Sequence, residues 1–547
     1  MRLILPSAKI VPEELQKLGK LPAIIYPINE SIVFDYLYKQ YESVCDGIDI
    51  IAFEKIDKIQ RRLSKYKKNN KAVIKELPKL EDLGFTVWYA LKDITEPVII
   101  NFADTIVLDN IFTCDADSFF FTEDHVSEQW TYYREENGVL TDIIDKSKVD
   151  STKKQKLFVG VFQIKEPQIF VRCLEKAAIN KPDNISSFYY ALQLYSTEHP
   201  FIPLKTNNWF DIGHADKYYS SNLEVKAREF NHITIDKDRS TLRKSSDDKD
   251  KFIGEIKWYL KLPADIEYVR PRIFSYSTAY SDPYVCMEYY SYHTVHELFL
   301  YGDLNRNQWI DIFKRIKFVC HDFSRYQLHD PDIQVALKDM YLDKTIQRFD
   351  KLKADTRFVK FFINPVRING KRYCSLAKVL DVIHELVPQL LLDVEAFNII
   401  HGDLCFANIL VDNNFSFIKV IDPRGKFGKY DIYGDFRYEL AKLFHSVDGK
   451  YDFIIKDQFE ISYDLSNANI NYSVCDRKRD YDLYNIFCDV FNDEIGDDLK
   501  KIELIEALLF LSMIPLHGES LNHQMAMLAT GLEILSKITD KVLYEED

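Results

Sequence analysis

Short apolar segments alternate with amphipathic ones over the first 225 residues. The segment 48–53 (IDIIAF) has the length and apolar character of a buried strand, and 55–68 repeats apolar residues at helical spacing. RLILPSA at the start and PVIINFADTIVL further on have the same strand character. Alternation of this kind is typical of a mostly parallel α/β sheet, which binds ligands at the carboxyl ends of its strands. The pattern therefore predicts an α/β domain over residues 1–225.

The pattern changes after Lys226. Two β-rich segments flank a polar turn at 236–240, and a helix follows that starts near Ser246 and stops at Pro263. From Asn307 onward, long amphipathic helices dominate. We therefore expect a second, α+β domain of two lobes, with the bounds 226–547 overall, about 226–295 for the small lobe and about 296–547 for the helical lobe.

Charge and composition narrow the classes of partner. The chain has 547 residues, and 71 Lys and Arg against 85 Asp and Glu give a net charge of −14. Such a chain is not attracted to nucleic acid or to anionic membranes as a whole. The longest apolar run, 507–516, is shorter than the roughly 18 residues of a membrane-spanning helix. We expect small molecules and nucleotides as partners, no nucleic acid and no membrane insertion; the oligomeric state stays open.

Cysteine usage bears on the compartment. The nine cysteines are scattered singly and form no C-x-x-C pair, so the sequence indicates neither a disulfide framework nor a zinc site. The N-terminal segment lacks the pattern of a signal peptide. Both observations favour the cytoplasm.

One motif carries specific chemistry. HGDLCFANILVDNNFSFIKVIDPRG places His401, Asp403, Asn408 and Asp422 in the spacing H-x-D-x-x-x-x-N, followed by a predicted hairpin and a strand that ends in Asp. Phosphoryl transfer requires mainly positioning and charge stabilisation. Asp403 is predicted to orient the attacking hydroxyl, Asn408 and Asp422 to hold Mg²⁺ against ATP, and His401 to brace the loop.

A second pair upstream fits the same chemistry. Lys244 ends a predicted strand and Glu255 lies in the following helix. A lysine that contacts the α and β phosphates of ATP, held by a glutamate, completes such a site. A solvated surface pair is the alternative.

Together these motifs resemble the aminoglycoside phosphotransferase and choline kinase family, whose fold is protein-kinase-like. The resemblance implies an adenine pocket near Met287, Glu288 and Tyr289, and an acidic residue, in the position of Asp435, that braces the catalytic loop. No G-x-G-x-x-G is present, so the turn 236–240 is expected to cover the phosphates. The phosphoryl acceptor, a choline-like alcohol or a sugar, is not identified by the sequence.

The residues after the metal aspartate depart from the family. Pro423, Arg424 and Gly425 stand where an apolar or aromatic residue is expected. Arg424 either binds an anionic group of the substrate or is an ordinary surface arginine.

The first domain resembles the sugar-phosphate and phosphocholine nucleotidyltransferases, which have a Rossmann-like fold. The resemblance rests on KLPAIIYPINESIVFDYL, EDLGFTVWYAL, NFADTIV and NNWFDIGHADKYYSSN. It implies that Asp104 and Asp211 hold Mg²⁺ and that CTP or UTP is the nucleotide. However, no glycine lies between Leu5 and Gly19, and Ala23 replaces the usual lysine. Bulky side chains keep backbone amides away from a triphosphate, so the activity of this domain stays open.

The two resemblances lead to one expected function. The second domain phosphorylates a small hydroxylated metabolite with Mg-ATP, and the first couples the product to a nucleotide for surface polysaccharide synthesis, in capsule or lipopolysaccharide. The alternative is a kinase whose first domain is a non-catalytic binding or docking module.

Overall fold

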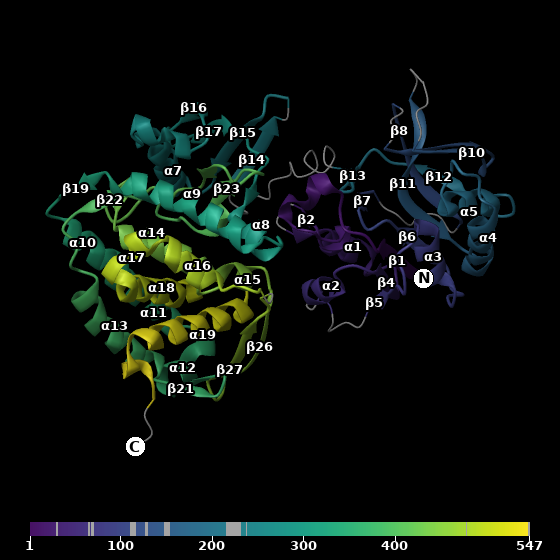
Figure 1. Ribbon diagram of the computed structural model, residues 1–547. Coiled ribbons are helices and arrows are strands. Elements are labelled where there is room, and N and C mark those ends of the chain that lie inside the picture. Colours follow the sequence, from purple (N-terminus) through teal and green to yellow (C-terminus); the bar gives the residue numbers. More distant parts are fainter. Residues whose placement is uncertain are drawn as a thin grey trace. The chain divides into compact units, whose positions relative to one another are not determined.

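The computed structural model describes the chain (Figure 1) except for ten short segments: 29–30, 64–65, 67–70, 110–115, 126–128, 147–153, 215–230, 237, 477–478 and 545–547. The chain forms two compact units. The first comprises Met1–Val225 with Tyr301–Asp303, and the second comprises Lys226–Leu300 with Leu304–Asp547.

The first unit is built on a mixed sheet with the strand order β10-β9-β11-β6-β1-β4-β5. Strands β6, β1, β4 and β5 are parallel, as the apolar pattern predicts, whereas β11, β9 and β10 continue the sheet in antiparallel pairing. The strands of this order are β1 (Arg2–Ser7), β4 (Gly47–Ala52), β5 (Ala72–Glu76), β6 (Val98–Asn101), β9 (Thr131–Glu136), β10 (Val139–Asp145) and β11 (Gln155–Ile164). Two further strands belong to the sheet: β8 (Ser118–Asp124) pairs with β11, and β12 (Ile202–Lys205) pairs with β8.

Aromatic side chains fill the core between this sheet and its helices. Phe119, Phe162 and Phe188 are almost completely buried and belong to one apolar cluster. The rings of Phe162 and Phe188 meet edge to face, a favourable geometry, and those of Phe119 and Phe162 are tilted. The helices of this unit include α1 (Val33–Tyr41), α2 (Ile56–Arg62), α3 (Leu83–Leu91), α4 (Pro167–Asn180) and α5 (Ser187–Ser196).

The second unit opens with an antiparallel sheet of order β14-β15-β17-β16 and the helix α7 (Lys249–Lys261). The predicted hairpin around 236–240 is confirmed. The predicted helix begins at Lys249 rather than near Ser246, because Asp248 caps its amino end by accepting from Lys251 N. The strands are β14 (Asn231–Asp236), β15 (Thr241–Ser246), β16 (Ile273–Ser277) and β17 (Tyr284–Glu288).

Helices dominate the rest of this unit, as predicted. They include α9 (Arg306–Ser324), α11 (Lys344–Lys353), α13 (Leu376–Leu390), α14 (Phe436–Val447), α18 (Leu499–Met513) and α19 (Leu521–Ile538). Strands β22 (Phe397–Ile399), β23 (Ile409–Val411) and β24 (Ile418–Val420) frame the H-x-D motif. In the described part of the chain, no helix has both the length and the apolar character required to cross a bilayer.

Candidate active sites

The H-x-D motif forms a buried loop between β22 and β23. Glu439 of α14 accepts hydrogen bonds from the backbone N–H groups of His401 and Gly402, the latter at 3.1 Å. Trp258 Nε1 donates to Ile400 O at 2.7 Å. Side chains from α7 and α14 therefore hold the loop, because its backbone polar groups must find partners once they are buried.

His401 ties this loop to the strand that carries the predicted metal ligand. Its Nε2 lies 3.0 Å from Ile421 O, so the neutral tautomer with a proton on Nε2 donates this bond. Burial lowers the pKa of His401 to about 4. The imidazole is therefore neutral and braces the loop, in the role expected from the sequence.

Asp403 contacts both a predicted and an unpredicted partner. Asn408 Nδ2 donates to Asp403 O at 2.8 Å and to Asp403 Oδ2 at 3.2 Å, which leaves the amide oxygen of Asn408 to serve as a ligand. Lys442 Nζ lies 2.9 Å from Asp403 Oδ1. Burial disfavours the ammonium charge, but the carboxylate of Asp403 outweighs it, and the pKa of Lys442 is raised.

Lys244 joins two carboxylates from separate elements. Its Nζ lies 2.8 Å from Glu255 Oε1 and 2.8 Å from Asp422 Oδ1. The Lys244 side chain is only 4% exposed, so the alternative of a solvated surface pair is wrong. Burial raises the pKa of Glu255 to about 7, although Lys244 acts against this shift.

The carboxylate of Asp422 opens on the cavity. It follows the β23–β24 hairpin and adopts a left-handed backbone with φ 57°, a conformation that costs energy in a residue other than glycine. Its side chain is 40% exposed to the cavity that also contains Asp403. The carboxylate of Asp422 and the amide oxygen of Asn408 are hard oxygen donors, which suit Mg²⁺.

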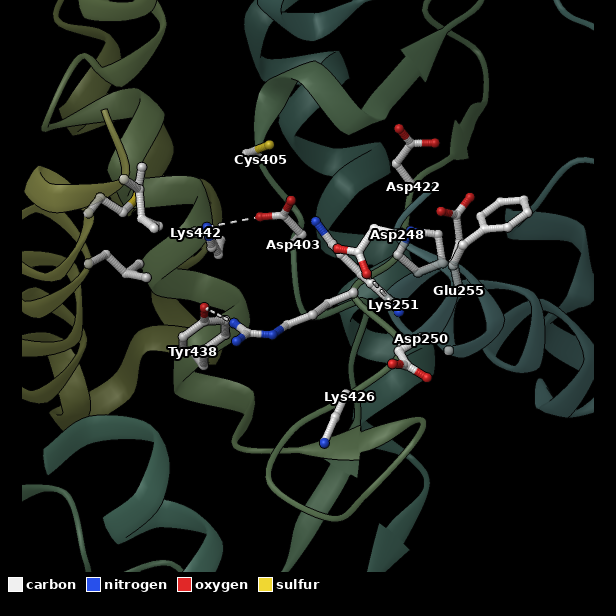
Figure 2. Close-up of a pocket in the computed structure, with 18 of the residues that line it drawn as sticks. Asp248, Asp250, Lys251, Glu255, Asp403, Cys405, Asp422, Lys426, Tyr438 and Lys442 are labelled. Carbon is white, nitrogen blue, oxygen red and sulfur yellow. Dashed lines mark hydrogen bonds and ion pairs between the residues drawn. The ribbon is translucent and has the colours of Figure 1, made fainter. Parts of the chain in front are cut away.

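One cavity of about 1690 Å³ is lined by five of these residues (Figure 2): Lys244, Glu255, Asp403, Asp422 and Lys442. Lys442 of α14 points to Asp403 from one side, and Tyr438 of the same helix accepts a hydrogen bond from Arg424, whereas Asp422 and Glu255 lie on the other side. Polar and charged groups from the small sheet, α7, the H-x-D loop and α14 thus converge on one space, as is typical of a ligand site.

The turn 236–240 is separated from Lys244 along β15. The turn 236–240 does not lie at Lys244: Ser240 O accepts from Tyr289 N at 2.9 Å, and Lys244 is four residues further along the strand, roughly 13 Å. The turn is therefore next to the predicted adenine segment. Met287 and Glu288 end β17 and Tyr289 follows it; they lie outside the lining of the cavity around Asp403, and their place in an adenine pocket stays a prediction.

The acidic brace of the catalytic loop is Glu439 rather than Asp435. Asp435 instead pairs with Arg437 at 2.9 Å and accepts a hydrogen bond from Tyr341. Sequence reasoning missed both Glu439 and Lys442. Only the structure shows that α14 is buried on almost every face. Charged residues within such a helix need partners.

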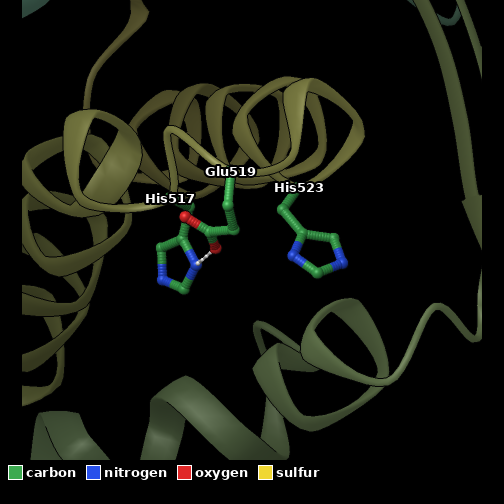
Figure 3. Close-up of side chains that lie close together, drawn as sticks. All are labelled: His517, Glu519 and His523. Carbon is green, nitrogen blue, oxygen red and sulfur yellow. Dashed lines mark hydrogen bonds and ion pairs between the residues drawn. The ribbon is translucent and has the colours of Figure 1, made fainter. Parts of the chain in front are cut away.

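A further cluster lies beside the cavity (Figure 3). One ligand atom from each of His517, Glu519 and His523 lies within 4.8 Å of the others. His517 Nδ1 is 3.1 Å from Glu519 Oε1, and His523 Nε2 is 2.8 Å from Asp457 Oδ1. Both imidazoles therefore pair with carboxylates.

In the first unit, Asp104 and Asp211 are brought together as predicted. Strands β7 (Thr105–Val107) and β13 (Trp209–Asp211) are antiparallel. A Cβ added to Gly213 would lie 2.8 Å from Asp104 Oδ2 and 3.2 Å from Asp211 Oδ1. Burial, with the charge of Asp211, raises the pKa of Asp104 to about 6. Two carboxylates held this closely fit a divalent cation. Residues 215–222 of the predicted second motif lie outside the described residues.

The segment in the place of the glycine-rich loop forms hydrogen bonds within the protein and buries its apolar side chains. A 3₁₀ helix spans Glu13–Leu18, and the side chains of Val11, Leu15 and Leu18 are buried. Val11 N donates to Leu21 O at 2.9 Å, and Leu15 N donates to Pro12 O at 2.9 Å. These amides are therefore engaged within the protein, in agreement with the missing glycines.

No protein-family model and no curated protein matches the chain. Among solved structures, a CTP:phosphocholine cytidylyltransferase from Streptococcus pneumoniae is similar at 14% identity, with 40% of this chain and 97% of that one covered and a TM-score of 0.34. An inositol-1-phosphate CTP transferase from T. maritima is similar at 13% identity, with 41% and 98% covered and a TM-score of 0.32. The roles assigned below rest on this chain's own residues.

Proposed function

We propose that the second unit is a small-molecule kinase that transfers the γ-phosphoryl group of ATP to a hydroxyl of a metabolite. The observation that carries the proposal is the convergence on one cavity of Lys244, Glu255, Asp403 and Asp422. Asn408 is buried beside this cavity and is bonded to Asp403. In this arrangement the groups that position phosphates and those that orient a hydroxyl face each other.

Each residue has a defined role in the proposed reaction. Asp403 orients the acceptor hydroxyl and takes its proton as the oxygen bonds to the γ phosphorus and the bond to the ADP oxygen breaks. Lys244, held by Glu255, exchanges its contact with Asp422 for the phosphates of ATP. Asn408 and Asp422 would hold Mg²⁺, which neutralises phosphate charge when bound. We place this activity in the cytoplasm, where ATP is available.

The test is phosphorus NMR of the intact protein with Mg-ATP and a panel of choline, ethanolamine, glycerol, sugars and their phosphorylated forms. A new monoester with release of ADP supports the proposal. Asp403→Asn is expected to abolish transfer and to leave the affinity for ATP unchanged, because Asp403 contacts the acceptor rather than the nucleotide. Normal turnover by this variant would remove Asp403 from the mechanism.

We propose nucleotidyl transfer by the first unit as a second function, on the evidence of the Asp104 and Asp211 pair. The kinase product would then react with CTP or UTP to release pyrophosphate, as in the activation of alcohols and sugars for surface polysaccharides. The closed segment around Glu13–Leu18 favours instead a non-catalytic module that binds a phosphorylated ligand.

Addition of CTP or UTP to the kinase reaction distinguishes these alternatives. Conversion of the monoester to a pyrophosphate diester, lost in the double variant Asp104→Ala/Asp211→Ala, supports transfer. A monoester that reacts no further supports the binding module.

A further inference from the structure

Three basic side chains lie together in the cavity that contains Asp403: Lys344, Arg348 and Arg424. Lys344 and Arg348 are one turn apart in α11 and project from the same face. Arg424 belongs to the loop after β24, and its stem packs on Gly402, where an added Cβ would lie 3.0 Å from Arg424 Cβ. The cluster therefore adjoins the residue that precedes Asp403.

No acidic side chain among the described residues neutralises this cluster. Within that part of the chain, Lys344 and Arg348 form no hydrogen bond or ion pair through their side chains. Arg424 Nη1 donates to the neutral hydroxyl of Tyr438 at 2.6 Å. By contrast, Lys442 in the same cavity pairs with Asp403.

The juxtaposition of like charges has an electrostatic cost. Burial, together with the charges of Arg424, Arg348 and Lys442, lowers the pKa of Lys344 to about 7, and Asp339 opposes this only weakly. Burial and the charge of Arg424 also lower the pKa of Arg348. An anion bound among these groups would relieve both effects.

We propose that Lys344, Arg348 and Arg424 bind an oxyanion of the phosphoryl acceptor, so that the substrate is a hydroxylated metabolite with a phosphate or carboxylate group. This inference rests on the kinase function proposed above. Guanidinium groups bind both oxyanions through paired N–H donors. The same three charges repel a cationic alcohol such as choline.

We place the cluster on the acceptor side of the cavity, because Arg424 packs on Gly402, the residue before Asp403. The positive charge of Lys442, which pairs with Asp403, helps to lower the pKa of Lys344. Lys244 and Asp422, by contrast, are the groups assigned to the ATP phosphates. The acceptor hydroxyl at Asp403 and the oxyanion at the cluster would thus belong to one molecule.

A binding experiment tests the site without catalysis. Isothermal titration of the full-length protein with inorganic phosphate, and separately with glycerate, is performed without nucleotide or Mg²⁺. We expect the double variant Lys344→Gln/Arg348→Gln to bind at least about tenfold more weakly than the wild type. Lys426→Gln is the matched control, because Lys426 is exposed and points away from Asp403 (Figure 2). Equal affinity in wild type and double variant overturns the inference.

A kinetic experiment tests the substrate class. Glycerol is compared with glycerol 3-phosphate and with glycerate, and glucose with glucose 6-phosphate. We expect the anionic member of a pair to have at least about tenfold higher kcat/KM, a preference that the double variant loses with KM for ATP unchanged. Whichever of glycerol 3-phosphate and glycerate has the higher kcat/KM shows whether the site prefers a phosphate or a carboxylate.

The outcomes distinguish this inference from the kinase proposal. If no acceptor is phosphorylated while anion binding still depends on Lys344 and Arg348, the kinase proposal fails and the anion site stands. If choline or another uncharged or cationic acceptor is preferred and the double variant retains full activity, the kinase stands and the anion site fails. A change in KM for ATP alone would reassign the cluster to the nucleotide and overturn the inference.

Discussion

The ammonium group of Lys442 lies 2.9 Å from the carboxylate of Asp403. A buried lysine of α14 thus forms an ion pair with the residue proposed to orient the acceptor. The contact fixes one carboxylate oxygen of Asp403, while Asn408 binds the other. Asp403 is thus held by two side chains that come from different elements. Positioning of this kind is a major part of catalysis in phosphoryl transfer.

Lys442→Met is expected to lower kcat by about a hundredfold with little change in KM for ATP, because Asp403 loses its orientation while the nucleotide contacts remain. Steady-state kinetics with ATP as the varied substrate measures the effects on kcat and on KM separately. Lys442→Arg should recover part of kcat, since it restores a cation to Asp403. Lys429→Met, at an exposed ion pair with Asp332, is the control and should retain full activity; an equal loss there would contradict a specific role.

Lys244→Met is expected to destabilise the second unit by about 3–5 kcal/mol, because it leaves the carboxylate of Glu255 buried without its partner. Thermal or urea unfolding measures the loss. The double variant Lys244→Met/Glu255→Leu should regain most of this stability, since it removes the orphaned charge. Additive losses in the two single variants and the double variant would show that the pair is not coupled.

Activity toward an anionic acceptor should fall as the pH rises through about 7. The protonated Lys344 binds the anion, and its pKa in the free protein is lowered to about 7 by burial and by Arg424, Arg348 and Lys442. The charge is therefore present below this pH and lost above it, which predicts a drop of about tenfold in kcat/KM between pH 6 and pH 9.

Lys344→Arg is the control for this pH profile. The guanidinium stays protonated over the whole range, so the drop should disappear in the variant. Titration of Glu255 affects both proteins equally and cancels in the comparison. A drop that persists in Lys344→Arg would assign it to another group.

Gly213→Ala is expected to weaken binding of a divalent cation to the first unit by at least tenfold, because its Cβ would lie 2.8 Å from Asp104 Oδ2 and displace that carboxylate. Titration with Mn²⁺, followed by electron paramagnetic resonance, measures the change. Kinase activity should stay unchanged. The control is Ile179→Ala, at an exposed position of the same unit; unchanged Mn²⁺ binding in Gly213→Ala would argue against the metal site.

The residues that sequence reasoning found are those whose spacing is local. His401, Asp403 and Asn408 share one loop, and the following hairpin returns the chain to Asp422, so a short stretch of sequence specifies their geometry. The sequence also predicts the pair of Lys244 and Glu255, because Lys244 lies on a strand directly before the helix that carries Glu255. The alternation of strands and helices was equally readable, since burial of one face imposes a period on the sequence.

The tertiary structure decided the contacts that join distant helices. Lys442 and Glu439 look like ordinary charges of an amphipathic helix, and only the burial of α14 against the catalytic loop turns them toward Asp403 and His401. Likewise, Lys344 and Arg348 show no motif, and they meet Arg424 because α11 lines the same cavity. The sequence by itself therefore determined the elements and the H-x-D motif, which depend on local periodicity and spacing. Only packing decided which charges line the cavity beside Asp403, because long-range side-chain contacts leave no periodic signal.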